Sequence, residues 1–356
     1  MACRFRLAAL LSALMTVCPA MQDMEDQAMG LDLTLTYGTA VLWTINSTSS
    51  VAMIEGSSEY RSAMSNFVRY SSNDTNDVSI RRPWFCRYFP SLERCTPDQD
   101  LVAVADMLYA LRTACDGFAS EPIPRSGVSV PVKAPWYNPT NQTTFLSAAI
   151  DLAGLPRPTG EYFFAGESVA VANGIGHCSF GINCNYWGPS EPTKVVLTVD
   201  YSQEAFTASL MSVDGGQFDE LYRQTRFDLG AASLQSRDSP HEHWEGVKEC
   251  LKRALEPTKG ALAHYYRNER LKKRLREALH VVVYGDAVDT AGLKAALQEC
   301  LEIFEPGFVA LREYHKMADP VFAAAQGDTA FLWPWDIDRP YSPQVEMEER
   351  MNKGEL

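Results

Sequence analysis

The chain has 356 residues, of which 46% are hydrophobic, and a formal net charge of −13 at neutral pH. This length and apolar content predict a large core, in one two-lobed unit or two closely packed domains, and they exclude a disordered chain. The negative charge argues against nucleic acid and anionic membranes as partners, because both are themselves anionic.

The first 20 residues have the layout of a secretory signal peptide. Arg4 and Arg6 precede an apolar run from Leu7 to Val17, and small residues follow. The run is too short to span a membrane. Loss of the two arginines on cleavage changes the formal charge from −13 to −15. We therefore expect a protein of the secretory pathway, either extracellular or in the lumen of the endoplasmic reticulum. The final KGEL resembles a retention signal for that compartment, and a chance tail is an equal alternative.

Seven cysteines remain after the expected cleavage, and the oxidising secretory route favours disulfides between them. The expected local pairs are Cys86 with Cys95 and Cys178 with Cys184, and Cys250 with Cys300 is a third option. Cys115, on a helix face, is then expected to be a buried free thiol. Three glycosylation sequons fit the same route, at Asn46, Asn73 and Asn141.

Residues 21–192 are expected to form the first of two lobes. Leu31 to Trp43 alternates apolar and polar side chains around Gly38, which predicts a β-hairpin or a bent strand, and a third strand is expected at 45–54. The other elements expected in this half are helices at 57–68, 99–115 (capped by Asp98), 141–153 and 167–173, and strands at 127–133 and 162–165.

Residues 193–340 are expected to form the second lobe, after a glycine-rich boundary loop at 174–192 and before a C-terminal tail at 341–356. Its first part, Lys194 to Leu221, predicts a β meander with a polar turn at 200–205. The elements expected after the meander are helices at 240–256, 260–279, 290–301 and 319–331, and a strand at 281–283. The helices at 231–280 would form a reduced helical subdomain. The alternation of strands and helices in both halves predicts an α/β fold with mixed sheets and flanking helices.

Residues 127–155, GVSVPVKAPWYNPTNQTTFLSAAIDLAGL, resemble a strand, turn and helix of the nucleotide-binding domain of the 70-kilodalton heat-shock chaperone family. The resemblance continues in order through 166–174, the meander, 281–287 and 319–330, so it covers nearly the whole mature chain and is greatest to divergent fungal members. It implies the two-lobed fold of the actin-like ATPase superfamily, which is ribonuclease H-like. It also implies ATP and magnesium as cofactors if the site is functional.

The resemblance assigns two phosphate turns to the chain. The family's D-L-G-T-T-Y corresponds to residues 32–37, and its D-L-G-G-G-T-F-D corresponds to residues 200–207. Asp32 and Asp200 then stand where magnesium-side carboxylates are expected, but the glycines that let backbone amides approach phosphate are replaced. The residues assigned in this way to a degenerate nucleotide site are Asp32, Thr34, Thr36, Tyr37, Asp200, Ser202, Gln203, Gly285 and Asp286.

The following differences from the family pattern argue against ATP hydrolysis. Side chains in place of glycine would cost about 1 kcal/mol each if the family's backbone angles were kept. Glu204 would then point a carboxylate at the triphosphate, at a cost of about 4 kcal/mol for two charges about 4 Å apart. The family's catalytic glutamate falls on Ala165, with Glu167 as a candidate two positions later, where a favourable interaction with a helix N-terminus also explains it.

These substitutions predict a pseudo-ATPase that needs no cofactor and acts by binding an unknown protein partner. The alternative is a functional ATP-binding or ATP-hydrolysing chaperone-like protein that uses Asp32, Glu167 and Asp200.

Two other readings involve serine or histidine. Residues 166–170, GESVA, resemble the G-x-S-x-G nucleophile elbow of esterases, with Ser168 as the nucleophile. The histidines that could act as its base have no distinguishing context: His241, His264, His280 and His315. His241 and His243 could be metal ligands, but no third ligand has diagnostic spacing, and a polar helix start explains them as well.

Overall fold

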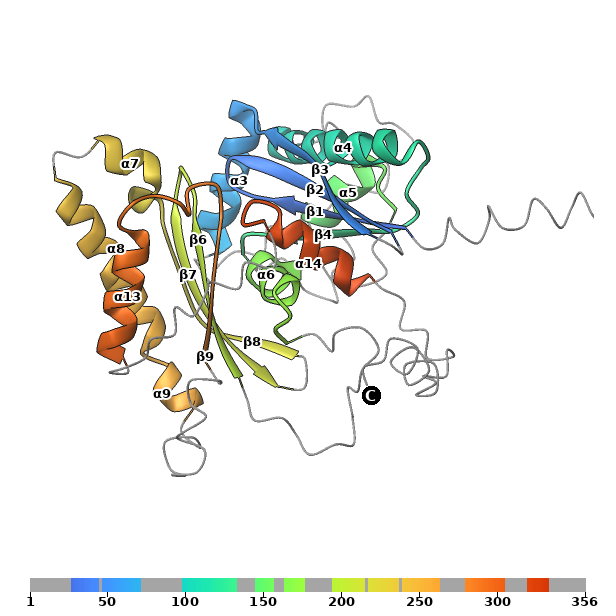
Figure 1. Ribbon diagram of the computed structural model, residues 1–356. Helices are drawn as coiled ribbons and strands as arrows, with labels where there is room; N and C mark the ends of the chain where they lie inside the picture. Colours follow the sequence, from blue (N-terminus) through green and yellow to red (C-terminus); the bar gives the residue numbers. More distant parts are fainter. Residues whose placement is uncertain are drawn as a thin grey trace, which may run out of the picture.

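The computed structural model describes residues 27–44, 47–71, 98–132, 145–156, 163–176, 194–214, 217–236, 239–262, 279–304 and 319–332. These residues form an α/β protein with two mixed sheets and flanking helices (Figure 1). No helix among them is both long and apolar enough to cross a membrane. The expected signal peptide and the following sites lie outside the described residues: Asn46, Asn73, Asn141, Cys86, Cys95, Cys178 and Cys184.

The first sheet has the strand order β3-β2-β1-β4-β5. Its strands are β1 (Ala28–Leu33), β2 (Tyr37–Thr44), β3 (Ser47–Glu55), β4 (Ser126–Val130) and β5 (Phe163–Phe164). β2 is antiparallel to both β1 and β3, whereas β4 runs parallel to β1 and β5 parallel to β4. The predicted hairpin is therefore confirmed, with its turn at residues 34–36.

The second sheet has the order β8-β7-β6-β9. Its strands are β6 (Lys194–Tyr201), β7 (Phe206–Asp214), β8 (Gln217–Arg226) and β9 (Leu279–Tyr284). The first three form the predicted antiparallel meander, and β9 runs parallel to β6. Each sheet thus begins with a three-stranded meander whose first strand then gains a parallel neighbour.

Asp32 and Asp200 occupy the same place in these two sheets. Each is the last residue but one of the first strand of its meander. Asp32 lies beside Thr39 of the antiparallel neighbour, and Asp200 lies beside Thr207. The chain therefore presents two related strand ends, each with one carboxyl group.

One face of the first sheet is covered by α3 (Ser58–Ser71), α4 (Gln99–Ala119) and α5 (Phe145–Ala153). α4 begins as predicted, with the Asp98 carboxylate accepting the backbone N–H of Asp100 at 3.1 Å. It continues past the predicted end at residue 115, and Ser120, with φ of 62°, ends it in the left-handed conformation.

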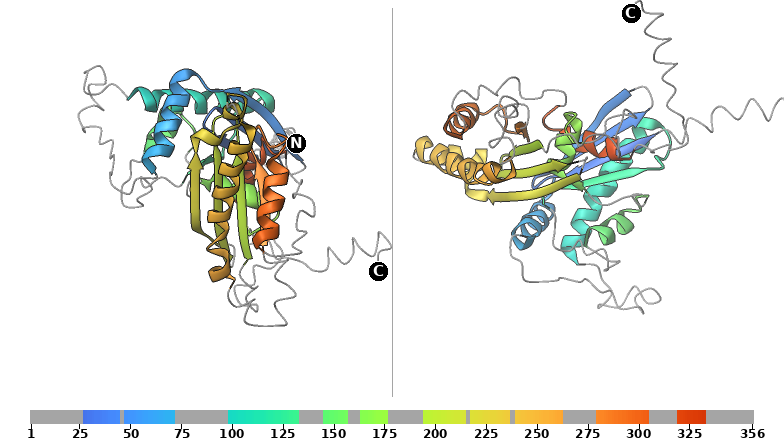
Figure 2. Two further views of the ribbon diagram at one scale, coloured as in Figure 1. Left: turned by 90° about the vertical axis from the view of Figure 1, so that its left-hand side faces the viewer. Right: turned by 90° about the horizontal axis from the view of Figure 1, so that it is seen from below.

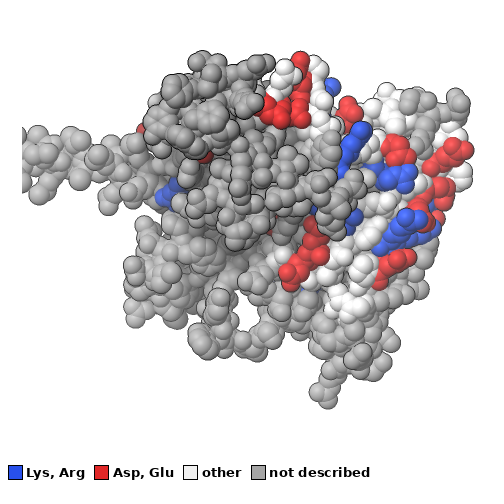
Figure 3. All heavy atoms as spheres, turned by 180° about the vertical axis from the view of Figure 1, so that it is seen from behind, with Lys and Arg blue, Asp and Glu red and all other residues white. Residues whose placement is uncertain are grey.

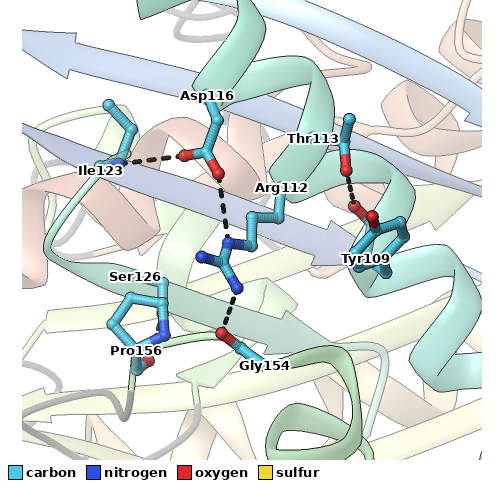
Figure 4. A network of polar contacts seen from close by, with 8 residues as sticks. All are labelled: Tyr109, Arg112, Thr113, Asp116, Ile123, Ser126, Gly154 and Pro156. Carbon is cyan, nitrogen blue, oxygen red and sulfur yellow. Dashed lines mark hydrogen bonds and ion pairs between the residues drawn. The ribbon is translucent and has the colours of Figure 1, made fainter. Parts of the chain in front are cut away.

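A polar network ties α4 to the two segments beside it (Figure 4). The Arg112 guanidinium pairs with Asp116 at 3.2 Å and also donates to the carbonyl of Gly154, at the end of α5. The second oxygen of Asp116 accepts the backbone N–H of Ile123 at 3.0 Å, just before β4. Ser126 donates to the Pro156 carbonyl at 2.8 Å, so α4, α5 and β4 are held as one unit.

The outer face of the second sheet is covered by α8 (Pro240–Leu255) and α13 (Leu293–Phe304), which lie side by side (Figure 2). Short helices precede and follow α8: η5 (Phe227–Leu229), α7 (Ala231–Ser236) and α9 (Thr258–Ala261). Figure 3 shows acidic and basic side chains interspersed on this side of the molecule. Lys248, for example, pairs with Glu245 at 3.0 Å and with Glu299 at 2.5 Å, so the surface is not of one sign.

Cys250 and Cys300 lie on these two helices, where both are buried free thiols. The optional disulfide between them is therefore not formed. The Cys300 thiol instead lies 3.6 Å from the Lys248 carbonyl, to which it donates. Cys115 on α4 is a buried free thiol, as predicted.

Two helices of small residues, α6 (Ala165–Ala172) and α14 (Ala323–Phe331), lie between the sheets (Figure 1). α14 packs on β1 and β4 of the first sheet and on α6, and α6 also contacts the second sheet. A Cβ atom on Gly327 would collide with the carbonyl of Ser168, so the two helix backbones cross in direct contact.

α14 starts later than predicted. The Asp319–Pro320 pair opens a turn, in which the Asp319 carboxylate accepts the N–H of Val321 at 3.0 Å, and the helix begins at Ala323. Although it falls in the range expected for the second lobe, α14 covers the first sheet. The order of layers is therefore helices, first sheet, α6 with α14, second sheet, helices.

Candidate functional site

Strand alternation points Asp32 and Asp200 into the same central layer. On β1, Met29, Leu31 and Leu33 belong to the core under α3, α4 and α5, so the intervening Gly30 and Asp32 face α14. On β6, Val195, Leu197, Val199 and Tyr201 belong to the core under α8 and α13, so Thr198 and Asp200 face α6. The two strand ends thus present their carboxyl groups to each other across the molecule.

The first turn is closed by the side chain of Thr34. Its hydroxyl donates to the carbonyl of Tyr37 at 2.7 Å and accepts the backbone N–H groups of Tyr37 at 3.0 Å and Thr36 at 3.3 Å. The N–H of Thr34 also donates to the Tyr37 carbonyl, at 3.0 Å. The buried Tyr60 hydroxyl donates to the carbonyl of Thr34 at 2.8 Å. Three amides of this turn are therefore satisfied by the protein itself.

Ser202 closes the second turn in the same way. Its hydroxyl donates to the Ala205 carbonyl at 3.1 Å and accepts the N–H of Ala205 at 3.3 Å, while its own N–H donates to the same carbonyl at 3.0 Å. The backbone of α7 lies against the turn, because the N–H of Ala231 donates to the Ser202 carbonyl at 2.9 Å. A hydroxyl residue two positions after the aspartate thus has one structural role in both halves.

Neither turn carries the backbone strain that loss of glycine would impose. Among the described non-glycine residues, only Ser120 has a positive φ. Residues 34–36 and 202–204 therefore adopt angles open to any L-residue. The expected cost of about 1 kcal/mol per lost glycine does not arise, because these turns differ from a glycine-dependent phosphate loop.

A third loop, after β9, closes over the second turn. Gly285 has a φ of 110° and packs so tightly on the Tyr201 carbonyl that a side chain would not fit. The N–H of Ala287 donates to that carbonyl at 3.1 Å. The Asp286 carboxylate accepts the backbone N–H of Gln203 at 3.0 Å. An amide in the position assigned to phosphate binding is therefore occupied by the chain's own carboxylate.

The carboxyl groups of the site influence one another. Burial raises the pKa of Asp32 to about 7, partly offset by a hydrogen bond of 2.8 Å from the Ser129 hydroxyl. The pKa of Asp200 is raised well above its usual range by burial and then by the charges of Asp32 and Asp286. Burial also raises the pKa of Asp286, against the effect of its bond to Gln203. The predicted site residues are thus brought together in an acidic environment.

Two tyrosines complete this environment. Burial raises the pKa of Tyr37 and Tyr284 above their usual range, and the neighbouring aspartates add to the effect. Both phenols therefore remain neutral. In the part of the chain that the structure describes, no three His, Cys, Asp or Glu residues are arranged to hold a metal ion.

Asp328 on α14 is an acidic residue that sequence reasoning missed. It is fully buried, accepts a hydrogen bond of 2.6 Å from the Ser168 hydroxyl, and has its pKa raised well above the usual range, mainly by burial. A charged residue within the small-residue sequence AAAQGDTAF was a signal that could have found it. Glu167, the candidate catalytic acid, is also buried, in the first turn of α6.

The same contacts argue against the esterase reading. Ser168 has no exposed surface, its hydroxyl donates to a carboxyl group, and the backbone of Gly327 lies directly on it. A nucleophile elbow instead exposes its serine to substrate.

The two histidines before Trp244 do not converge. His241 is exposed, whereas His243 is buried and lies 3.1 Å from the Tyr201 hydroxyl and 3.3 Å from that of Ser233. His243 therefore joins the start of α8 to the end of β6.

No protein-family model matches the chain, and no curated protein matches its sequence.

Proposed function

We propose that the chain has a two-lobed actin-like ATPase fold with a degenerate nucleotide site, and that it works by binding another protein. The repeated strand order of the two sheets supports this fold, as do the equivalent places of Asp32 and Asp200. The position of α6 and α14 between the sheets also supports it. The boundary of the lobes would fall near residues 192 and 193.

One observation carries the functional half of the proposal: the turn amides already bind oxygen atoms of the chain. The Thr34 and Ser202 hydroxyls each accept a backbone N–H in their own turn, and the Asp286 carboxylate accepts the N–H of Gln203. A phosphate would have to displace these oxygens to bind there. It would also approach three carboxyl groups, Asp32, Asp200 and Asp286, and besides burial the charges of two of them already raise the pKa of the third, Asp200. A phosphate would meet the same repulsion.

The protein-binding half of the proposal is supported by the surface. α4 exposes Tyr109 and Phe118, each 59% accessible, and the neighbouring α5 exposes Leu152 at 46%. We propose that one or more of these exposed apolar side chains contact the partner.

The test is the melting temperature of the purified mature protein with and without Mg-ATP or Mg-ADP. We expect no shift. A ligand bound at one site and present at 100 times its dissociation constant would add about 2.7 kcal/mol of stability. Asp200→Ala is the control variant. A clear shift in the wild type that is lost in Asp200→Ala would overturn the proposal.

A functional ATPase is the second candidate, because Asp32 and Asp200 are retained at equivalent strand ends. In that case Mg-ATP would stabilise the protein, and phosphate release would fall at least tenfold in Glu167→Gln. If the wild type and Glu167→Gln released phosphate at the same rate, the activity would come from a contaminating ATPase, and this candidate would be excluded.

We further propose that the protein travels the secretory route. Expression in a eukaryotic host should give a mature N-terminus near residue 21, and glycosidase treatment should lower its mass. Glycans are expected at Asn46, Asn73 and Asn141, and a product that retains Met1 and does not respond to glycosidase would contradict this proposal.

A further inference from the structure

Four polar side chains form a chain through the apolar interior where α14 crosses α6. Ser129 on β4 donates to Asp32 on β1 at 2.8 Å, and Ser168 on α6 donates to Asp328 on α14 at 2.6 Å. At most 3% of any of these residues is exposed. The Ser129 hydroxyl and amide also lie against the Asp328 carboxyl, so the two pairs form one network across four elements.

Asp328 lacks the partners that a buried carboxylate needs. One of its oxygens accepts from Ser168 at 2.6 Å, whereas the other is approached only loosely by the Ser129 hydroxyl and amide and makes no well-formed hydrogen bond among the described residues. A buried carboxylate without compensating bonds or a counter-ion is costly, whereas a carboxylic acid is tolerated.

The described elements packed against α14 carry no basic side chain. Asp32 on β1 acts on Asp328 by its charge, and β4 contributes only serines and apolar residues. The titratable residues of the other two elements are Glu167 on α6 and Tyr37 on β2. Arg125, just before β4, donates instead to the carbonyl of Leu332, at the end of α14, at 3.5 Å.

We propose that Asp32 and Asp328 share one proton through Ser129, and that this proton holds α14 between the two sheets. The proton sits on Asp328, whose hydroxyl donates to Ser129, while Ser129 donates to Asp32 and Ser168 donates to Asp328. The network then carries one negative charge instead of two. The raised pKa of both carboxyl groups agrees with this arrangement.

Loss of the proton would leave two carboxylates on opposite sides of the α14 contact. The contact cannot adjust by small steps, because Gly327 lies directly on the Ser168 carbonyl and Gly30 on that of Ala325. Repulsion therefore acts on the docking of the whole helix. Since the folded protein binds a proton that the unfolded chain has lost at neutral pH, stability must fall as pH rises.

The first test is the urea midpoint of unfolding of the full mature chain between about pH 5.5 and pH 9. We expect the wild-type midpoint to fall with pH, and Asp328→Asn to remove most of the slope above about pH 7, where Asp32 has already lost its proton, and to exceed the wild type at the alkaline end. Asparagine keeps an oxygen for Ser168 and places an N–H donor at Ser129. Ser126→Ala is the matched control, because it removes the hydrogen bond of a buried serine to Pro156, outside this network, and should keep the slope.

A wild-type midpoint that is flat or rises with pH would refute the shared proton. The same conclusion would follow if Asp328→Asn kept the wild-type slope above about pH 7.

The second test needs no variant, so it stands even if Asp328→Asn does not fold. Hydrogen exchange of wild-type peptides covering α14 is compared with that of peptides covering α8, after correction for the intrinsic effect of pH on exchange. We expect α14 to lose protection at alkaline pH before α8 does. Equal loss in both helices would show that α14 is not released separately, and would overturn the proposal.

This inference does not depend on the proposed function. The pH series and the Mg-ATP assay measure different properties, so either proposal can fail while the other stands.

Discussion

At the scale of single residues, hydroxyl side chains replace glycine as the means of closing a tight turn. Thr34 and Ser202 each follow a strand-end aspartate, and each satisfies backbone groups three residues later. These bonds favour one rigid turn and leave few amides for an anion. The hydroxyl residues that stand in place of glycine therefore stabilise these turns by their own hydrogen bonds.

The Thr34 hydroxyl can be tested by substitution. Thr34→Val keeps the shape but removes one donor and one acceptor, and we expect it to lower the free energy of unfolding by about 1–2 kcal/mol. Thr34→Ser keeps the hydroxyl and should stay within about 0.5 kcal/mol of the wild type. Urea unfolding measures both variants. Equal stability of the two would mean that the hydroxyl bonds do not stabilise the turn.

Asp32 is expected to make the protein less stable as pH rises. Its pKa in the folded state is about 7, whereas an unfolded aspartate has a pKa of about 3.9. The folded state thus favours the protonated form, and its advantage is lost as pH rises from about 4 through about 7. The difference of about three pKa units sets an upper limit of about 4 kcal/mol.

Asp32→Asn should therefore unfold at a higher urea concentration than the wild type at about pH 8, and this advantage should vanish at about pH 4. Asp98→Asn, at the exposed cap of α4, is a control whose effect should not depend on the pKa of a buried group. A destabilising effect of Asp32→Asn that is the same at both pH values would contradict this expectation.

At the scale of elements, the crossing of α6 and α14 determines how the sheets are joined. Both helices consist mainly of small residues, which lets their backbones touch and brings Ser168 and Asp328 into hydrogen-bonding distance. Phe164, Val169 and Met211 surround the crossing with apolar contacts. Only glycine fits at position 327, and any side chain there must push the helices apart.

Gly327→Ala should therefore be strongly destabilising, by about 3 kcal/mol or more, because the added methyl group meets backbone atoms that cannot rotate away. Gly117→Ala in α4 is the matched control. Nothing lies near its added Cβ, and alanine favours a helix by up to about 1 kcal/mol, so it should be neutral or stabilising. Thermal unfolding of both variants measures the contrast, and similar effects of the two would refute the close crossing.

At the scale of the whole molecule, α14 makes the two halves depend on each other. It follows the second sheet in the chain but covers the first, so neither half buries its inner face alone. The apolar cluster between the sheets draws residues from β5, α6, β6, β7, β9 and α14. The two sheets should therefore unfold together.

We expect thermal unfolding at about pH 6 to be a single cooperative transition, with coincident midpoints by far-ultraviolet and near-ultraviolet circular dichroism. In Gly327→Ala the two halves should become less coupled, and the transition should broaden or divide. Two separate wild-type transitions would show that α14 does not join the halves.

Much of the fold could be predicted because its signals are local. The hairpin within Leu31 to Trp43, the cap at Asp98 and the meander from Lys194 onward all follow from local capping and apolar alternation within a few positions. The start of α14 could not be predicted in this way. Asp319 and Pro320 are good helix-start residues, yet they form the turn before the helix.

The site was predicted only in part. The resemblance brought attention to Asp32, Asp200 and Asp286, and all three lie in one acidic region. Asp328 was missed because its hydrogen-bond donor, the Ser168 hydroxyl, lies 160 positions away in the sequence. No local pattern around Asp328 indicates that contact.

The sequence by itself determined which side of each strand is apolar, and therefore that Asp32 and Asp200 point away from the helix-covered cores. That property depends on alternation along one strand. Only the tertiary structure decided which groups lie beside these carboxyl groups. Besides burial, Asp32 and Asp286 raise the pKa of Asp200, Asp286 accepts the amide N–H of Gln203, and Asp32 acts on the buried Asp328 of α14. The physical reason is that burial and electrostatic repulsion depend on distances between segments far apart in the chain, which no local pattern contains.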